Sequence, residues 1–123
     1  MIQGASGSGK SALALQLIAL GAELVADDRV QISRPDEGPP LASAPAPISG
    51  LIEARGLGLL RVPHRASVRL MAAVDLDHAE TARLPERREL DVLGWPIRLF
   101  HNVARDHFPA ALKCYLMGES ETP

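Results

Sequence analysis

The chain has 123 residues, about the length of one domain. Hydrophobic residues make up 46% and charged residues 23%, which is typical of a folded globular domain and excludes a disordered chain. The 13 Lys and Arg against 15 Asp and Glu give a net charge of −2, which excludes electrostatic attraction to nucleic acid or to an anionic membrane as the main interaction.

The first predicted element is a helix over residues 10–20. Leu13, Leu17 and Leu20 recur at spacings of three and four residues, which places them on one face of a helix. Gly21 follows, and glycine is common just beyond the end of a helix. The sequence therefore predicts a helix with one buried face that ends at this glycine.

A short buried strand is expected next, over residues 24–26, and two carboxylates, Asp27 and Asp28, follow it directly. Val30 and Ile32 alternate with polar residues, as in a neighbouring strand. The two carboxylates are therefore expected at the carboxyl end of a strand.

The middle of the chain is predicted to be a surface loop followed by two strands. Residues 35–47 hold five of the ten prolines, a composition that excludes a helix or a central strand. Residues 57–62 are an apolar run that ends at Pro63. Residues 68–76 alternate between apolar and other positions without a break, which is the clearest strand signal in the chain.

The last elements are a hairpin and a helix. Residues 89–92 and 97–100 are separated by a Leu-Gly-Trp-Pro turn, which indicates a hairpin. Residues 109–117 have apolar positions at helical spacing, and Gly118 follows them. The sequence therefore predicts a terminal helix that ends at this glycine.

A phosphate loop occupies residues 4–11, which match the pattern G-x-x-x-x-G-K-[ST] at every fixed position and lead into the predicted helix. In this motif backbone N–H groups surround phosphate oxygens, the lysine reaches the terminal phosphates, and the serine hydroxyl joins a magnesium shell. A chance glycine-rich turn seldom supplies Lys and Ser at the fixed offsets before a helix. The candidate nucleotide-binding residues are Gly4, Ala5, Ser6, Gly7, Ser8, Gly9, Lys10 and Ser11.

The segment before this loop is short. Only Met1, Ile2 and Gln3 precede it, whereas a phosphate loop usually follows a buried strand of about five residues. Without that strand, backbone groups of its neighbours would be unpaired and the loop would be less firmly held. We therefore expect a single domain that lacks its first strand at the N-terminus.

Asp27 and Asp28 are candidate catalytic residues. They follow the loop by one helix and one strand, so they can return to the sheet edge at which α/β sites collect. Either carboxylate can orient or deprotonate a nucleophile. Two adjacent aspartates are otherwise typical of a solvated turn, and the phosphate loop is what favours the functional interpretation.

A second unusual string spans residues 51–58, Leu-Ile-Glu-Ala-Arg-Gly-Leu-Gly. Two glycines weaken an apolar strand and require a reason such as a close backbone approach. Glu53 and Arg55 place charges beside them. Taken in order, residues 4–15, 24–28 and 51–58 resemble the bacterial HPr kinase/phosphorylase (HPr serine kinase) family, in the short form of its C-terminal catalytic domain.

The resemblance implies an α/β fold: a P-loop kinase of the phosphoenolpyruvate-carboxykinase-like type, with a mixed sheet and flanking helices. Residues 1–123 would then form a single catalytic domain that transfers phosphate from ATP or pyrophosphate, with Mg²⁺, to a serine of the phosphocarrier protein HPr. The resemblance also implies a homo-oligomer, a hexamer. The reverse phosphorylase reaction is left open, because the family's late loop rich in proline, arginine and glycine is not recognisable in residues 101–106.

Residue roles follow from the same resemblance. Asp28 matches the residue that acts as base in the kinase direction and as proton donor in the reverse one. Ser11 and Glu53 match magnesium ligands, and Lys10 is expected to hold the donor phosphates. Arg83, in an Ala-Arg-Leu-Pro string, resembles the family's later active-site arginine.

Two other functions stay open on the residues alone. A small-molecule kinase of the general P-loop class would need a substrate lid, for which residues 35–47 are the candidate. A catalytically silent nucleotide-binding regulator is the second, because the segment before the phosphate loop is so short.

The expected compartment is the cytoplasm. A single cysteine, Cys114, excludes an internal disulfide, and the framework of a small secreted domain is absent. The longest near-apolar stretch, residues 12–22, is far short of the ~20 residues that span a bilayer, and the N-terminus carries no signal-peptide pattern. We therefore expect a cytoplasmic protein with no membrane or nucleic-acid partner.

Overall fold

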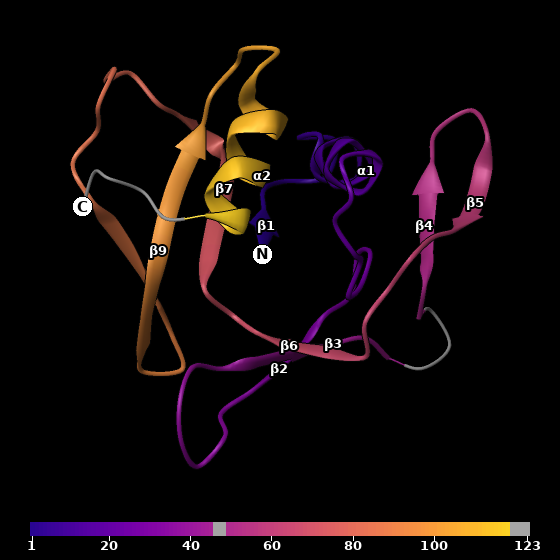
Figure 1. Ribbon diagram of the computed structural model, residues 1–123, viewed down its shortest axis with the longest axis horizontal. Helices are drawn as coiled ribbons and strands as arrows, with labels where there is room; N and C mark the ends of the chain where they lie inside the picture. The colour runs from indigo at the N-terminus through magenta and orange to yellow at the C-terminus, as the bar shows by residue number, and fades with distance from the viewer. Residues whose placement is uncertain (46–48, 119–123) are drawn as a thin grey trace.

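Residues 1–45 and 49–118 are described by the computed structural model (Figure 1). The elements are, in chain order, β1 (Ile2–Gln3), α1 (Lys10–Ala19), β2 (Gln31–Ser33), β3 (Leu41–Ser43), β4 (Leu51–Ala54), β5 (Gly58–Arg61), β6 (Ser67–Arg69), β7 (Ala72–Ala79), β8 (Arg88–Val92), β9 (Trp95–Asn102) and α2 (Phe108–Met117). Both helices span ten residues, and no helix in the described ranges is long and apolar enough to cross a membrane.

The largest sheet has four strands in the order β1-β7-β9-β8. β1 and β9 both pair in parallel with β7, which lies between them, whereas β8 is antiparallel to β9. The carboxyl ends of β1, β7 and β9 therefore meet at one edge of the sheet, and the phosphate loop leaves β1 at that edge. The mixed sheet with flanking helices expected from the sequence is confirmed.

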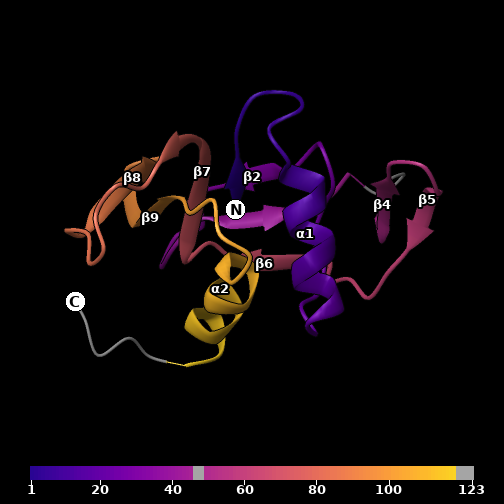
Figure 2. The ribbon, with the colours of Figure 1, turned by 90° about the horizontal axis from the view of Figure 1, so that it is seen from above.

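Apolar side chains pack on both faces of this sheet. Ala73 and Val74 are consecutive in β7 and so point to opposite faces. Val74 packs with Leu13 of α1 and Phe108 of α2, and these two helices lie side by side (Figure 2). Ala73 packs with Ala42 of β3 on the other face, where β2, β3 and β6 form an antiparallel sheet. The order of layers is helices, mixed sheet and antiparallel sheet.

Three predicted elements are confirmed with small shifts in their ends. α1 ends just before Gly21, whose φ of 103° is the left-handed conformation that closes a helix. β8 and β9 form the expected hairpin, and its turn residues Leu93 and Gly94 have φ of 52° and 83°, as a type I′ turn requires. α2 is the expected terminal helix.

The prediction of a strand over residues 24–26 is wrong. Leu24 alone pairs, in an isolated parallel bridge to His64. The chain turns directly afterwards, because Asp28 has a φ of 64° and the amide of Arg29 donates to the carbonyl of Asp27 at 2.6 Å. The two carboxylates therefore lie in a tight turn rather than at the end of an extended strand.

Two further expectations are corrected by strand pairing. The proline-rich segment 35–47, predicted to be a loop, contains β3, the middle strand of the antiparallel sheet. Residues 41–43 lie between Pro40 and the next proline, so each has a backbone N–H group that can pair with a neighbouring strand. The alternating run 68–76 is divided between β6 and β7, which belong to different sheets, and the break falls at residues 70–71. Alternation alone does not say with which sheet a residue pairs.

The strand expected over residues 57–62 is one arm of a hairpin. β4 and β5 pair in antiparallel register, with Ala54 opposite Gly58, and β4 contacts α1. Gly56 and Gly58 have φ of 91° and 116°, and a side chain added at either would meet no atom within 4 Å. These glycines are required by the turn conformation, not by the close backbone approach that we expected.

Candidate functional site

The phosphate loop, residues 4–11, connects β1 to α1. Gly9 is the N-cap of α1 and has a φ of 100°. Because it is a glycine, it offers no side chain to cap the N-terminus of the helix. A Cβ at Gly4 would lie 2.4 Å from the Ser8 hydroxyl oxygen, so the loop closes on itself only with glycine there. A helix N-terminus whose N–H groups have no side-chain acceptor is a binding site for an anion.

Lys10 folds back over this loop. Its Nζ donates a hydrogen bond to the carbonyl of Gly4 at 2.6 Å, and it lies 3.5 Å from the carbonyl of Ala5. The cation is therefore held beside the anion site rather than extended into solvent. The next residue, Ser11, lies in the first turn of α1.

Asp27 connects α1, the helix that follows the phosphate loop, to the segment 51–58. Its Oδ1 accepts a hydrogen bond from the Ser11 hydroxyl at 2.9 Å, and its Oδ2 accepts one from the backbone N–H of Glu53 at 3.0 Å. One carboxylate thus ties α1 to β4. The three sequence motifs that were singled out separately meet at this residue.

Asp28 lies beside Asp27 in the turn and is exposed. A cavity of about 320 Å³ has Lys10, Ser11 and both aspartates in its lining, whereas most of its other lining residues are apolar. We call it the acidic cavity. Four of the candidate residues therefore line one cavity that reaches the phosphate loop, so a phosphate on the loop and a hydroxyl group in the cavity could meet there.

The other two candidate residues lie outside this cavity. Glu53 is on β4 with its side chain exposed, and its backbone contact to Asp27 brings it near Ser11. Arg83 is exposed in the connection between β7 and β8 and does not line the acidic cavity. That connection starts at Glu80, whose carboxylate accepts from the backbone of residues 81 and 82 and pairs with Arg88.

Sequence reasoning missed an acidic cluster at the end of β7. The carboxylate of Asp77 accepts the backbone N–H of Ala5 through both oxygens, at 2.9 and 3.1 Å, so it fixes the start of the phosphate loop. Asp75 accepts the backbone N–H of Asp77 at 2.9 Å and lies 2.7 Å from Nδ1 of His78. The hydrogen bond from the Asp77 backbone, followed by the one from His78, lowers the pKa of Asp75 below its usual value.

A signal for this cluster was present in the sequence. Asp75 and Asp77 follow apolar residues in the alternating run 68–76 and just beyond it, so they lie near the end of a strand. The sequence did not reveal that this strand, β7, is the parallel neighbour of β1 and ends beside the phosphate loop.

The donors around Ser11 suit a small divalent cation. A serine hydroxyl and aspartate carboxylates are oxygen ligands, and Mg²⁺ typically takes one or two carboxylates and completes its shell with waters and substrate phosphates. Among residues 1–45 and 49–118, no three His, Cys, Asp or Glu side chains converge on a preformed cation site. The oxygen donors of Ser11 and Asp27 suit Mg²⁺.

The two hydrogen bonds of Asp27 predict an effect on stability. In Asp27→Asn one side-chain oxygen remains to accept a hydrogen bond. The –NH₂ group that replaces the other oxygen faces a donor and cannot accept its hydrogen bond. The expected loss is about 1–2 kcal/mol of the free energy of unfolding, since each donor was paired with an ionised group. Urea denaturation measures it. Asp28→Asn is the matched control and should unfold as the unchanged protein does, because asparagine adopts the left-handed conformation readily; equal loss in both variants would contradict the expectation.

Comparison with known proteins gives a family match. The model of the family described as "HPr Serine kinase C-terminal domain" matches residues 1–82. The HPr kinase/phosphorylase of Bordetella pertussis is 42% identical over 110 residues, which cover 80% of this chain and 36% of that protein. The protein of the same name from Listeria monocytogenes (serotype 4a) is 39% identical over 98 residues, 74% of this chain and 31% of that protein. The chain thus spans about a third of the length of these curated relatives.

A solved structure shares the fold. The HPr(Ser) kinase/phosphatase from Coxiella burnetii matches with a TM-score of 0.75 at 22% sequence identity, over 94% of this chain and 79% of that one. The match extends beyond residue 82, where the family model ends, and so includes β8, β9 and α2 in the likeness.

Proposed function

Because the chain belongs to the HPr serine kinase C-terminal domain family, we propose that it is an ATP-dependent protein serine kinase that phosphorylates an HPr-like phosphocarrier protein. The observation that carries this proposal is the acidic cavity, where Lys10, Ser11, Asp27 and Asp28 meet at the mouth of the phosphate loop. An ATP donor and an HPr acceptor also place the proposed activity in the cytoplasm.

Residues 4–11 hold the donor phosphates in this proposal. The first-turn N–H groups of α1 and the Nζ of Lys10 supply positive charge, and Lys10 is already positioned by its hydrogen bond to Gly4. Phosphoryl transfer requires mainly positioning and charge neutralisation, which these groups can provide.

Asp28 orients the acceptor serine in the proposal. Its carboxylate is exposed at the wall of the acidic cavity, so a hydroxyl brought by a protein acceptor can reach it. Asp27 is less suited to this task, because both of its oxygens already accept hydrogen bonds, from Ser11 and from Glu53. Asp28 therefore accepts the proton of the serine hydroxyl, and Asp27 holds the site together.

Ser11 and Glu53 would hold a Mg²⁺ ion. When bound, this ion neutralises charge on the donor phosphates. Asp27 keeps the Ser11 hydroxyl directed toward the acidic cavity, and it also fixes the strand that carries Glu53. Arg83 is proposed to reach the site from the β7–β8 connection when the acceptor binds, as the family pattern implies.

A small-molecule kinase would need residues 35–47 as a lid, and the structure gives that idea little support. β3 lies within this segment and pairs on both sides. Arg69 holds the carbonyls of Glu37 and Pro39, each at 2.9 Å. Residues 35–45 are thus held to the rest of the chain by strand pairing and by Arg69, and residues 46–47 lie outside the described residues. A cavity without a lid favours a protein acceptor.

We propose a homo-oligomer, a hexamer by family likeness, as the assembly. Large apolar side chains at the tip of the β4–β5 hairpin are exposed, Leu57 by 79% and Leu59 by 70%. Such a patch is typical of a surface that another chain covers. Sedimentation velocity gives the number of chains directly.

The proposed function is tested by incubating the chain with ATP, Mg²⁺ and purified HPr, and by locating the phosphate in the product by mass spectrometry. We expect one phosphoserine on HPr and no product on an HPr variant in which that serine is alanine. Binding of ATP without any phosphorylated HPr would favour the silent regulator instead. Adding inorganic phosphate to phosphorylated HPr tests the reverse reaction in the same assay.

A further inference from the structure

One peptide group of the phosphate loop has a charged side chain on each side. The peptide between Gly4 and Ala5 donates its N–H to the carboxylate of Asp77, whose oxygens lie at 2.9 and 3.1 Å. The carbonyl of the same peptide, on Gly4, accepts a hydrogen bond from the Nζ of Lys10 at 2.6 Å. The N–H and C=O of a trans peptide point in opposite directions, so this single peptide lies between the carboxylate and the ammonium group.

This peptide needs an external contact to keep its orientation. Residue 4 must be glycine, because a Cβ there would lie 2.4 Å from the hydroxyl oxygen of Ser8. A glycine, here with a φ of 156°, also leaves the peptide that follows it free to rotate. A rotated peptide would turn the Gly4 carbonyl away from Lys10. Because Asp77 holds the N–H on the other side, the carbonyl stays directed at the lysine.

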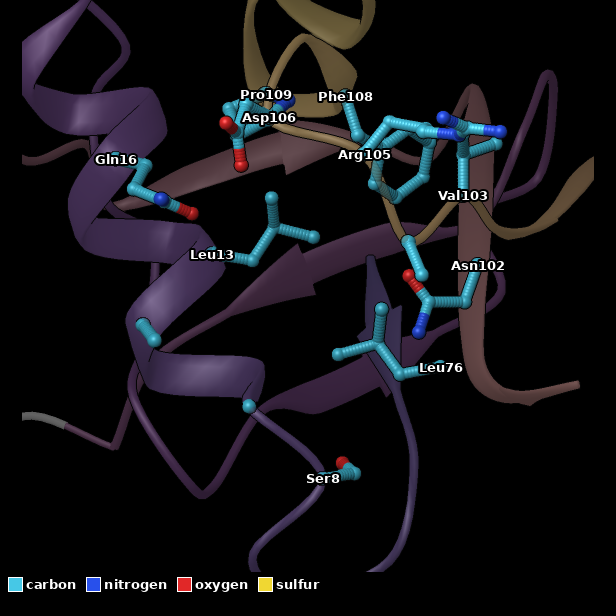
Figure 3. A pocket seen from close by; sticks show the side chains of 13 residues that line it. Ser8, Leu13, Gln16, Leu76, Asn102, Val103, Arg105, Asp106, Phe108 and Pro109 are labelled. Atoms are coloured by element: carbon cyan, nitrogen blue, oxygen red, sulfur yellow. The ribbon is translucent and has the colours of Figure 1, made fainter. Parts of the chain in front are cut away.

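The pairing of β7 with β1 places Asp77 for this contact. The last pair in register is Gln3 with Asp75, and Asp77 lies two residues beyond it along β7. Leu76 faces the pocket that Leu13 of α1 also lines (Figure 3), and the residues on either side of Leu76 point to the other face of the strand. The carboxylate of Asp77 therefore lies at the carboxyl edge of the sheet, beside the start of the phosphate loop.

A second carboxylate holds the backbone of Asp77. One oxygen of Asp75 accepts the backbone N–H of Asp77 at 2.9 Å, and its other oxygen lies 2.7 Å from Nδ1 of His78. The ring of His78 stacks on that of His101 in β9, with the ring centroids 5.4 Å apart. The end of β7 is thus hydrogen-bonded within itself and packed against its neighbour, which restricts the movement of Asp77.

Asp77 contacts Lys10 only through the peptide. No ion pair joins these two side chains in the part of the chain that the structure describes. A direct ion pair would occupy the ammonium group, whereas the contact through the peptide leaves N–H groups of the lysine for phosphate. Hydrogen bonds in series polarise one another, so the carboxylate makes the Gly4 carbonyl a stronger acceptor for the lysine.

We propose that Asp77 is a positioning residue for Lys10. It holds the Gly4–Ala5 peptide so that the lysine stays at the phosphate loop, and the affinity for the donor phosphates rises as a consequence. The use of Lys10 to bind ATP rests on the proposed function. The position of the lysine does not, because it can be measured without any ligand.

The two lysines of the chain, Lys10 and Lys113, allow a direct test by NMR of a sample labelled with ¹³C in its lysines. Each lysine gives its own ε-CH₂ signal, and Lys113→Ala shows which signal belongs to Lys10. Asp77→Ala removes the acceptor of the Ala5 N–H, whereas Asp77→Asn keeps one acceptor oxygen. Asp77→Thr, whose hydroxyl is one bond shorter and which suits a strand, replaces the alanine variant if that variant does not fold.

Asp91→Ala is the matched control. One oxygen of Asp91 accepts the backbone N–H of Gly94 at 2.8 Å in the β8–β9 turn, and Asp91 does not line the acidic cavity. The control therefore loses the same kind of hydrogen bond at a place away from the lysine. It should lose about as much stability to urea as Asp77→Ala, while the Lys10 signal and the affinity for ATP stay unchanged.

We expect Asp77→Ala to move the Lys10 signal but not the Lys113 signal, and to bind ATP about tenfold more weakly by calorimetry. Asp77→Asn should keep its affinity for ATP within about threefold. An unmoved Lys10 signal in folded Asp77→Ala overturns the inference, even if its affinity for ATP falls. An equal change of the signal in Asp91→Ala also overturns it. If the Lys10 signal moves as expected but the unchanged chain does not bind ATP, the positioning of Lys10 stands and the proposed function falls.

Discussion

Replacing Lys10 by alanine is expected to abolish nucleotide binding. The Nζ of Lys10 lies over the phosphate loop, 2.6 Å from the carbonyl of Gly4, and it is the cation that both lines the acidic cavity and belongs to the loop. A hydrogen bond from a charged donor contributes about 1.5–3 kcal/mol, and a lysine beside two phosphates makes more than one. The affinity for ATP, measured by calorimetry, should therefore fall by at least about 100-fold.

Lys113→Ala is the matched control for this variant. Lys113 is the second of the two lysines in the chain; it lies on α2 and does not line the acidic cavity. It should leave the affinity for ATP unchanged. If Lys10→Ala keeps its fold by circular dichroism and still binds ATP as the unchanged chain does, residues 4–11 are not the nucleotide site.

Asp28→Asn is expected to retain ATP binding and to lose phosphoryl transfer. Asparagine keeps the size of the side chain and tolerates the φ of 64°, so the turn that carries the site is preserved. It cannot accept the proton of a serine hydroxyl, and loss of a general base lowers a rate by roughly 10²–10⁴-fold. The rate of HPr phosphorylation at saturating ATP measures the effect.

Two variants separate this role from alternatives. Asp36→Asn removes an exposed carboxylate that does not line the acidic cavity and should leave the rate unchanged. Asp27→Asn should weaken the fold, as its hydrogen bonds to Ser11 and Glu53 require. A normal rate in Asp28→Asn together with a lost rate in a folded Asp27→Asn would assign the base to Asp27 instead.

The local parts of the fold were predictable because short-range chemistry determines them. α1 follows from leucines at helical spacing with glycines at both ends, and the β8–β9 hairpin follows from its two-residue turn. The division of residues 68–76 between two sheets was not predictable, because it depends on pairing with β3 and β9, which lie far away in the chain. Periodicity predicts on which face of a strand a residue lies, whereas the strands with which it pairs determine the sheet to which it belongs.

The same distinction applies to the site. The phosphate loop is a contiguous motif, so its sequence was sufficient to place Lys10 and Ser11 on α1. Asp27 accepts hydrogen bonds from Ser11 and from the backbone of Glu53. These contacts join segments that are far apart in the sequence, so no spacing of residues in the sequence indicates them. Asp77 was missed for the same reason, since its contact with Ala5 joins residues 72 positions apart.

The most direct measurement is a crystal structure of the chain with a non-hydrolysable ATP analogue and Mg²⁺. We expect the phosphates within residues 4–11, with the terminal phosphate beside Lys10 and facing Asp28. An analogue bound away from the phosphate loop would contradict the assignment of the site. An analogue on the loop with its terminal phosphate directed away from Asp28 would contradict the role given to Asp28.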